Sequence, residues 1–468
     1  MFIQKPLPFI QKYLNSLDDA LKEYNPGKTL SRTQKYWLGF CIMGILLTNS
    51  INWTAFARIS LGQYNTTALS WMFRHSKIAW EIIFHMSLRI ILKGYGITKG
   101  VLAIDDSDKK RSKSAKTIYG IHKVKDKSTG GYFMGQQLVF LILITPRVTI
   151  PAGFAFHLPD PALSKWYKEK KKLKKQGIPS LKHPKKPKRD PQYPTMGQIS
   201  LALMREFKKY HADICIQAIV ADALYGTDKF MNGASGVFDG IQVVSQLRTN
   251  QKVMLRKRSL SLETYFKRYP PVRQKIRIRG GDEVSVYVSS ARLYVHAHKQ
   301  KRFVIALKYE GETECRYLVA SDMTWQTLDI VQVYTLRWLI EVFLQDHKAN
   351  EGWGSLAKQP GEEGSYRSLT LSLLVDHCLL FHPDQLALNE NNLPAKTVGS
   401  LCEAIKVESI LTLMQDIMSK SDPKSEFERL SMVLKEQFSK SNLSGKHMNA
   451  RIWGNFQPSP SLRYRAAA

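Results

Sequence analysis

Polar side chains that could act on phosphate follow a regular spacing in the segment 334–348. They are Tyr334, Arg337, Glu341 and Lys348. Apolar residues recur through this segment, neither Pro nor Gly interrupts it, and Gly352 follows it, which predicts one continuous helix. At about 100° per residue, the spacing brings the four side chains within roughly 60° of one another on the helix surface. Such a stripe could form one wall of a site for phosphate and a metal ion. A solvated helix face with ion pairs has the same composition, so the interpretation depends on partners for Glu341 elsewhere in the chain.

Two further carboxylates are predicted to follow buried strands. One apolar run leads into Asp105 and Asp106, and a second, 215–220, leads through an alanine into Asp222. Acids beside a core are costly, and the sheets of α/β proteins carry their sites at the carboxyl ends of strands. With Glu341, Asp106 and Asp222 would give three carboxylates, which can hold two divalent ions such as Mg²⁺. A pair of such ions about 4 Å apart can activate water and stabilise the leaving oxygen of a phosphoryl transfer.

The strands that position these acids are predicted to belong to an α/β domain at residues 99–365. Three apolar runs suggest an antiparallel meander. They lie at 101–104, 132–144 and 148–157. A further strand at 240–248 ends on Arg248, and residues 249–322 alternate apolar and polar side chains, which predicts a β-rich block.

Helices are predicted on both sides of this domain. Residues 1–98 contain short helices with polar turns, which are typical of helix-turn-helix DNA-binding bundles and of many inert bundles. Residues 366–468 are predicted to form a buried helix, two or three more helices and an irregular tail from Asn442.

A lysine-rich segment at 158–196 interrupts the pattern of strands. Its runs 170–175 and 184–189 consist mostly of Lys and Pro and predict an exposed, flexible loop. The segment could also lie along a phosphate backbone, where each neutralised phosphate releases counterions.

The whole chain is strongly basic. Its 468 residues include 69 Lys and Arg against 39 Asp and Glu, a formal charge of +30. Such an excess suits a polyanionic partner, with nucleic acid first and an anionic membrane surface second. The five Cys are scattered without a C-x-x-C pair, which disfavours a disulfide framework or a zinc site and favours a reducing cytoplasm. The most apolar stretch, 37–47, is too short to span a bilayer.

These motifs together resemble a known family. The spacing of the four residues in 334–348 is similar to the Y-(2)-R-(3)-E-(6)-K signature of bacterial insertion-sequence transposases of the DDE type, in the insertion-sequence-four family. The segment 104–107, Ile-Asp-Asp-Ser, resembles the strand of the first acid and places that acid at Asp106, with Asp105 as the rival. Asp222, with an aromatic residue three positions on, resembles the second acid. The resemblance covers residues 100 to 355.

The resemblance implies an RNase H-like catalytic core with a β-rich insertion at 249–322. It also implies that Asp106, Asp222 and Glu341 hold two Mg²⁺ or Mn²⁺ ions. Phosphates near the cut would be gripped by several side chains of the signature helix, with Arg248 as a weaker candidate. These side chains are Tyr334, Arg337 and Lys348.

The family cuts double-stranded DNA at the ends of an element and joins the freed 3′-hydroxyl to target DNA without a nucleotide cofactor. By analogy, the protein is expected to be a homodimer that bridges two ends through its C-terminal helices, in the bacterial cytoplasm with the nucleoid. Two other functions stay open. One is an RNase H-like nuclease without strand transfer, and the other is a domesticated DNA-binding protein.

One feature of the family is missing from its expected place. Members can carry a Trp in the β insertion that stacks on a base flipped from a DNA hairpin, but residues 226–324 contain none. Trp325 lies just beyond this range, and Tyr265, Phe266 or Tyr287 could substitute for it.

Overall fold

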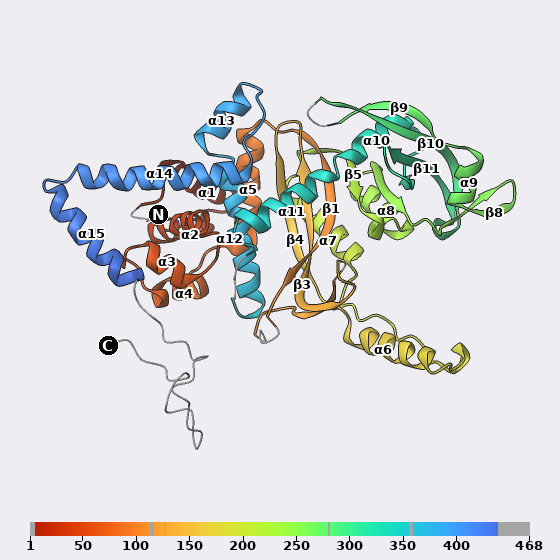
Figure 1. The fold of residues 1–468 in the computed structure, drawn as a ribbon, viewed down its shortest axis with the longest axis horizontal. Helices are drawn as coiled ribbons and strands as arrows, with labels where there is room; N and C mark the ends of the chain where they lie inside the picture. The colour runs from red at the N-terminus through yellow and green to blue at the C-terminus, as the bar shows by residue number, and fades with distance from the viewer. Residues whose placement is uncertain (1–4, 113–116, 127, 279–280, 355–358, 439–468) are drawn as a thin grey trace, which may run out of the picture.

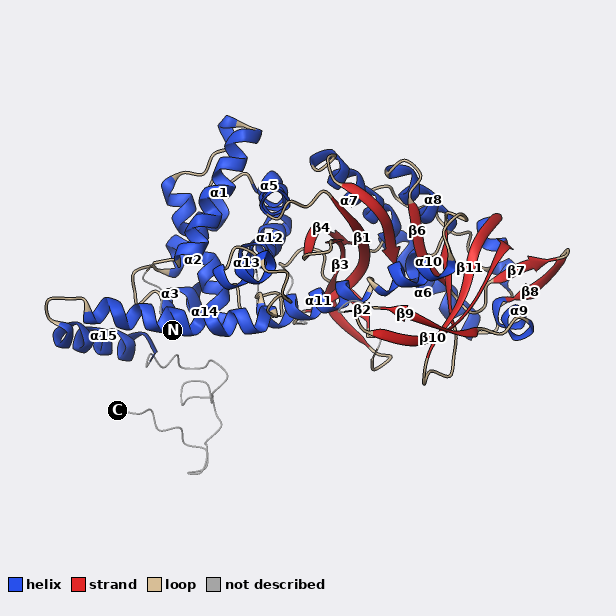
Figure 2. Ribbon diagram, turned by 90° about the horizontal axis from the view of Figure 1, so that it is seen from above, coloured by secondary structure: helices blue, strands red, loops and turns tan. Residues whose placement is uncertain are grey.

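The computed structural model describes residues 5–112, 117–126, 128–278, 281–354 and 359–438 (Figure 1). It has a mixed α/β architecture. A group of helices built from both ends of the chain lies at one side, and a long twisted sheet with its own helices lies at the other (Figure 2). The irregular tail predicted from Asn442 lies outside the described residues.

Twelve of the described strands form one sheet. The first six are β1 (Lys99–Lys110), β2 (His122–Lys125), β3 (Tyr132–Ile144), β4 (Thr149–His157), β5 (Cys215–Ala221) and β6 (Gln242–Leu247). The others are β7 (Lys252–Leu255), β8 (Arg258–Ser261), β9 (Val272–Arg277), β10 (Glu283–Val295), β11 (Gln300–Tyr309) and β12 (Arg316–Ala320). Their order is β2-β3-β1-β5-β6-β12-β11-β10-β7-β8, with β4 also on β3 and β9 also on β10.

The predicted meander is confirmed. β1 pairs antiparallel with β3, and β3 pairs antiparallel with β4. On its other edge β1 pairs with β5, and β5 pairs with β6, and both pairs are parallel. The β-rich block at 249–322 continues this sheet, because β12 pairs antiparallel with β6.

Helices cover both faces of this sheet. The helices of the sheet region are α6 (Pro161–Lys175), α7 (Met196–Tyr210), α8 (Asp228–Val237), α9 (Leu262–Arg268), α10 (Thr327–Thr335) and α11 (Trp338–Asn350). Apolar residues of α7 and α8 share a core with one face of β1, β3 and β5, and residues of α10 and α11 share a core with the other face.

The helices from the two ends of the chain pack together. They are α1 (Pro8–Tyr24), α2 (Arg32–Thr48), α3 (Trp53–Ile59), α4 (Thr66–His75), α5 (Trp80–Gly94), α12 (Gly361–Leu379), α13 (Pro383–Glu390), α14 (Val398–Met418) and α15 (Pro423–Phe438). Residues of α1 to α5 form one hydrophobic core with residues of α12 and α14, among them Leu374 and Ile405. No single helix in the described segments is long and apolar enough to cross a membrane, and the one pair that passes by length and composition, α2 with α3, is bent by 92°.

The prediction of one helix over 334–348 is wrong. The segment is divided between α10 and α11, which a tight turn at Leu336 and Arg337 joins. Backbone hydrogen bonds of the turn span three residues instead of four, as from the Arg337 amide to the Tyr334 carbonyl at 3.1 Å. Neither Pro nor Gly marks this change, but tertiary contacts accompany it, because Tyr334 bonds with Gln246 and Arg337 pairs with Asp105.

The prediction of a flexible loop in the lysine-rich segment is wrong over residues 161–175, which α6 occupies, whereas residues 176–195 contain neither an α-helix nor a strand. The Asp160 side chain caps the helix by accepting from the Leu163 amide, and Pro161 stands at the first helical position. Lysine has a high helix propensity, and lysines in the last turn also interact favourably with the helix dipole. The exposure predicted for this segment is confirmed.

Candidate active site

An acidic pocket of about 490 Å³ opens at one end of the core sheet. It is lined by Asp105, Asp106, Ser107, Asp108, Asp222, Arg337, Glu341, Leu344, Gln345 and Lys348. We call it the acid pocket. The structure thus brings together all three predicted catalytic acids, the rival Asp105 and two of the predicted phosphate-binding side chains, although these residues lie on three separated parts of the chain.

The sequence predicted that the first two acids lie at the end of a strand. In the structure they lie within β1. On one edge, the pairing of β1 with β5 stops at Ile104 and Ala221. On the other edge, the pairing with β3 continues as far as Lys110. β1 therefore extends beyond β5, its parallel neighbour. Asp105 and Asp106 lie in this extension, where the pairing with β5 has ended. Since side chains alternate along a strand, these two acids point to opposite faces.

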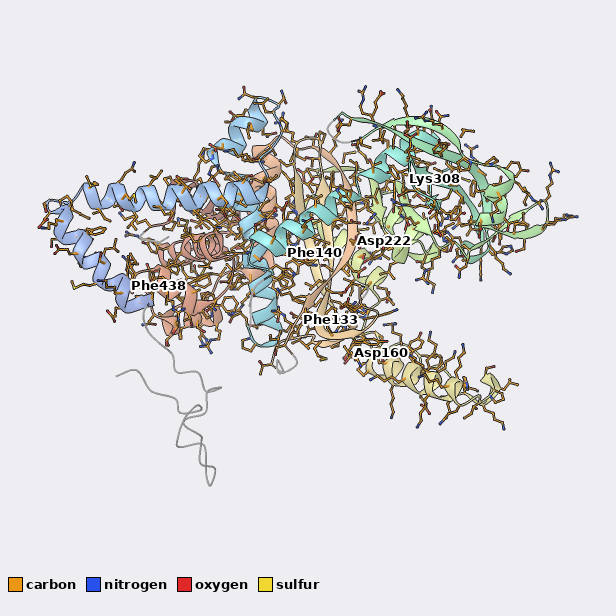
Figure 3. The ribbon with its side chains drawn as sticks, in the orientation of Figure 1. Phe133, Phe140, Asp160, Asp222, Lys308 and Phe438 are labelled. Carbon is orange, nitrogen blue, oxygen red and sulfur yellow. The ribbon has the colours of Figure 1, made fainter. Side chains whose placement is uncertain are left out.

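Asp222 directly follows β5, as predicted, and several hydrogen bonds hold its backbone. Its carbonyl accepts from the Ser245 hydroxyl at 2.8 Å and from the Tyr225 amide at 2.9 Å. The next part of the loop is fixed from the β-rich block, because the Gly226 carbonyl lies 3.0 Å from Nε2 of the buried His298. Figure 3 shows Asp222 at the centre of the molecule, where the core strands meet that block.

Arg337 joins the first acidic strand to the helix of the third acid. Its guanidinium pairs with Asp105 at 3.2 Å and with Glu341, one turn on, at 2.5 Å. The Arg337 and Asp105 side chains are only 17% and 14% exposed, so solvent screens this pair weakly, whereas Glu341 is 37% exposed. One arginine thereby holds β1 and α11 at a fixed separation.

Negative charge is crowded in the acid pocket. Burial first, and then the neighbouring Asp106 and Asp222, raise the pKa of Asp105 to about 7, although Arg337 acts in the opposite direction. Asp108, which the sequence analysis did not single out, adds a buried carboxylate oxygen that has no hydrogen-bond partner among the described residues. Its position two residues after Asp106, on the same face of a strand, is the signal that could have found it.

Cations lie next to these acids. Lys109 is buried, and its ammonium donates to the Trp353 carbonyl. Arg111 donates to Gln136 at 2.8 Å and, like Lys109, lies over the Trp353 ring. Burial, followed by the charges of Arg111 and Lys348, lowers the pKa of Lys109 to about 7. Acids and cations thus form adjoining groups, an arrangement that suits a phosphodiester bound together with metal ions.

Two predicted DNA-binding residues lie outside the acid pocket. Tyr334 is buried, and its hydroxyl accepts from the Gln246 side chain at 2.5 Å, but its ring stays beside the Arg337 guanidinium, 6.0 Å from the ring centre, so the predicted neighbourhood of these two residues is kept. Arg248 is exposed just after β6 but does not line the pocket.

The aromatic residues considered as substitutes for the missing Trp differ in exposure. Tyr265 and Phe266 belong to α9 and are buried in the core. Trp325 is half-buried against the core beneath α10, and Tyr287 is half-buried with the Lys308 ammonium 5.2 Å from its ring centre.

The donor set of the acid pocket fits a hard divalent cation. All candidate ligands are carboxylate oxygens, which Mg²⁺ and Mn²⁺ prefer. Burial is the main cause of the raised pKa of Asp105, and the neighbouring Asp106 and Asp222 add negative charge that such a cation would neutralise. In the parts of the chain that the structure describes, no three His, Cys, Asp or Glu side chains are grouped closely enough to hold a metal ion as they stand. Two of the acids are instead paired with Arg337, so a metal would have to compete with that arginine.

No family model and no curated protein matches this chain. Among solved structures, it is similar to a piggyBac transposase in a synaptic complex with hairpin DNA. The two chains share 9% sequence identity with a TM-score of 0.42, over 95% of this chain and 87% of that one.

Proposed function

We propose that this protein is a DNA transposase of the DDE type with an RNase H-like core. The observation that carries the proposal is the convergence of Asp106, Asp222 and Glu341 on one pocket that also contains Arg337 and Lys348. The proposed core is supported by the order of the strands, a meander followed by two parallel strands. It is also supported by the position of the acids, at the carboxyl end of β5 and beside it on β1. The continuation of the sheet into the block at 249–322 agrees with an insertion before the helix of the third acid.

The metal ions of the proposed site would be held by Asp106, Asp222 and Glu341, with Asp105 as the alternative first ligand. Two Mg²⁺ or Mn²⁺ ions would supply an activated water and stabilisation of the leaving oxygen. With Asp106 as the first ligand, Asp105 would keep Arg337 beside the scissile phosphate. Arg337 can then exchange a carboxylate partner for a phosphate oxygen, since its fork binds either group in the same geometry.

The other cations of the site would orient the DNA strand. Lys348 lines the pocket, and Lys109 and Arg111 lie behind it, so a phosphate that enters meets positive charge on one side and carboxylates on the other. After the first cut, the freed 3′-hydroxyl would attack a second phosphodiester in the same pocket. Each joining step exchanges one phosphodiester for another, so no nucleotide cofactor is required.

We further propose that the transposase acts as a homodimer on double-stranded DNA, in the bacterial cytoplasm with the nucleoid. Exposed apolar side chains on one stripe of α14 support this assembly. They are Val407, Ile410, Leu411, Met414 and Met418. A second copy would cover them while each copy holds one element end.

The proposal is tested by incubating the protein with Mg²⁺, a DNA fragment that carries the repeats flanking its gene, and a second DNA. Cuts at a fixed position, with the new 3′-ends joined to the second DNA, are the expected result. Cutting at scattered positions without joining would favour the nuclease, and binding without cutting under Mg²⁺ or Mn²⁺ would favour the domesticated DNA-binding protein.

A further inference from the structure

Residues 161–189 form a basic arm that projects from the body of the protein (Figure 1). α6 leads outward, and residues 176–189 return toward the sheet. The arm contains eleven Lys and one Arg against a single acid, Glu169. All eleven lysines are exposed, and none forms an ion pair within 4.0 Å in the part of the chain that the structure describes. The arm therefore carries a high density of uncompensated positive charge.

The arm is held in a defined shape. The buried Asp160 side chain accepts from the Leu163 amide at 3.1 Å and from the Asp190 amide at 3.0 Å, so one carboxylate ties both ends of the arm. Farther out, the Trp166 indole donates to the Pro184 carbonyl at 2.7 Å. The second aromatic ring of α6, Tyr167, also contacts the return segment, with the Lys186 ammonium 5.8 Å from its ring centre.

The arm begins at the end of the sheet that carries the acid pocket. Asp108 of β1 is paired with Gln137 of β3, and Gln137 is paired with His157, the last residue of β4. β4 thus ends two strands from the acids, a distance of about 10 Å at the usual strand spacing. Asp160, where the arm starts, follows three residues later (Figure 3). A polymer bound at the pocket can therefore continue along the arm.

We propose that the basic arm binds the phosphate backbone of duplex DNA next to the acid pocket. The 15 residues of α6 give a helix about 22 Å long. A duplex of that length carries about 13 phosphate charges on its two strands, a number close to the cations of the arm. Lysines bind phosphates as point charges, so the contact is independent of sequence and sensitive to salt. That the polyanion is DNA rests on the proposed function, whereas the arm as a polyanion-binding surface rests on the structure alone.

An anionic membrane fits the arm less well. Helices that lie in a membrane surface bury a continuous apolar face. In α6 Leu163 is buried and Trp166 and Leu173 are half-buried, so Tyr167 is the one large apolar side chain exposed among its lysines, and no continuous apolar face is formed.

The test compares two sets of four Lys→Gln substitutions, since Gln keeps the helix propensity of Lys and removes its charge. The arm variant changes lysines that share one face of α6. They are Lys168, Lys171, Lys172 and Lys175. The control variant changes four exposed lysines of α1 and α15. They are Lys12, Lys22, Lys424 and Lys435. Binding to a duplex of arbitrary sequence is measured over a range of salt concentrations in EDTA, so that no cutting is needed.

For the arm variant, the slope of log binding constant against log salt concentration should be smaller in magnitude by about 2 to 4. Each lost phosphate contact removes about 0.9 from that slope. The control variant should keep the slope of the parent. An arm variant with the parental slope would overturn the proposal, and so would loss of binding to phosphatidylserine vesicles without any change in DNA binding.

A second measurement uses the unaltered protein and so does not depend on a variant that folds. Bound duplex should protect the lysines of the arm from chemical acetylation, while Lys12 and Lys424 stay reactive. Equal labelling of the arm with and without DNA would overturn the proposal. Failure of the proposed function looks different, because the protein would then bind DNA through the arm and yet leave element ends uncut in Mg²⁺.

Discussion

At the scale of residues, the guanidinium of Arg337 holds the side chains of the acid pocket in their observed arrangement. Arg337 pairs with a carboxylate of β1 and a carboxylate of α11, and so holds two acids from distant parts of the chain in contact with the same group. Spacing alone could predict that Arg337 and Glu341 are neighbours, because they lie one helical turn apart. The pairing with Asp105 could not be predicted, since it depends on how α11 crosses the sheet.

A second group of buried ionisable residues lies behind the pocket, at the end of α11. His347 and Glu351 are fully buried, with Nδ1 of the imidazole 2.8 Å from the carboxylate. Burial lowers the pKa of His347 to about 3 and raises the pKa of Glu351 to about 8. Burial and the neighbouring Glu351 also raise the pKa of Asp376 well above its usual value. The structure therefore holds a neutral imidazole against carboxyl groups that keep their protons to unusually high pH.

These shifts predict how stability depends on pH. From pH 4.5 to 8 the folded protein keeps a proton on Glu351 that the unfolded chain has lost, so the free energy of unfolding falls as pH rises. The depressed pKa of His347 acts in the opposite direction, but only below pH 6.5. Relative to Glu351→Gln, the parent should therefore lose on the order of 1–2 kcal/mol between pH 6.5 and 8.

Thermal unfolding of the parent and of Glu351→Gln at several pH values checks this prediction. The lowered pKa of Lys109 affects both proteins, so it cancels in the difference between them. A difference in melting temperature that stays constant from pH 6.5 to 8 would show that Glu351 is ionised in the folded protein.

At the scale of elements, the loop after β5 sets the position of Asp222. Its strand and its carboxylate could be predicted from an apolar run that ends in an acid. The contacts that fix the loop could not, because Ser245 and His298 come from β6 and from the segment before β11. The turn between α10 and α11 could not be predicted either, because its residues favour a helix as much as the residues on either side do.

Gly226 shows how closely this loop approaches its neighbour. A β-carbon at this position would lie 2.0 Å from the Gln246 carbonyl oxygen, so Gly226→Ala must displace the loop that carries Asp222. We expect a loss of stability of about 1–3 kcal/mol and slower DNA cutting. Gly236→Ala is the matched control, because a β-carbon there meets no atom within 4 Å and Gly236 lies in α8. Melting temperatures and cutting rates should separate the two variants, and parental cutting by Gly226→Ala would refute the positioning role.

At the scale of the whole molecule, the helices from both ends of the chain act as one unit behind the pocket. α12 and α14 complete the core of α1 to α5. The C-terminal end of α11 is tied to that unit, since the Gly352 amide donates to the Asn49 side chain at 2.8 Å. Helical composition at both ends could be predicted from the sequence. That the two ends share a core could not, because amphipathic patterns do not identify the partner of an apolar face.

Because the core is shared, a destabilising substitution in α12 should also destabilise the N-terminal helices. Leu374 is fully buried in this core, so Leu374→Ala should cost about 2–5 kcal/mol. Hydrogen exchange of the amides of α2 should accelerate in this variant. Leu181→Ala, at a residue that is 98% exposed, should leave both stability and exchange unchanged. Slow exchange in α2 despite Leu374→Ala would mean that the two groups of helices unfold independently.

The central claim is that the acid pocket cuts DNA, and the rate of Mg²⁺-dependent cutting by Glu341→Gln tests it most directly. Glu363→Gln is the matched control, because Glu363 also pairs with an arginine one helical turn away but lies outside the pocket. We predict that Glu341→Gln binds DNA like the parent and cuts its element ends at least about 100-fold more slowly, whereas Glu363→Gln cuts at the parental rate. Parental cutting by Glu341→Gln would contradict the assignment of the pocket.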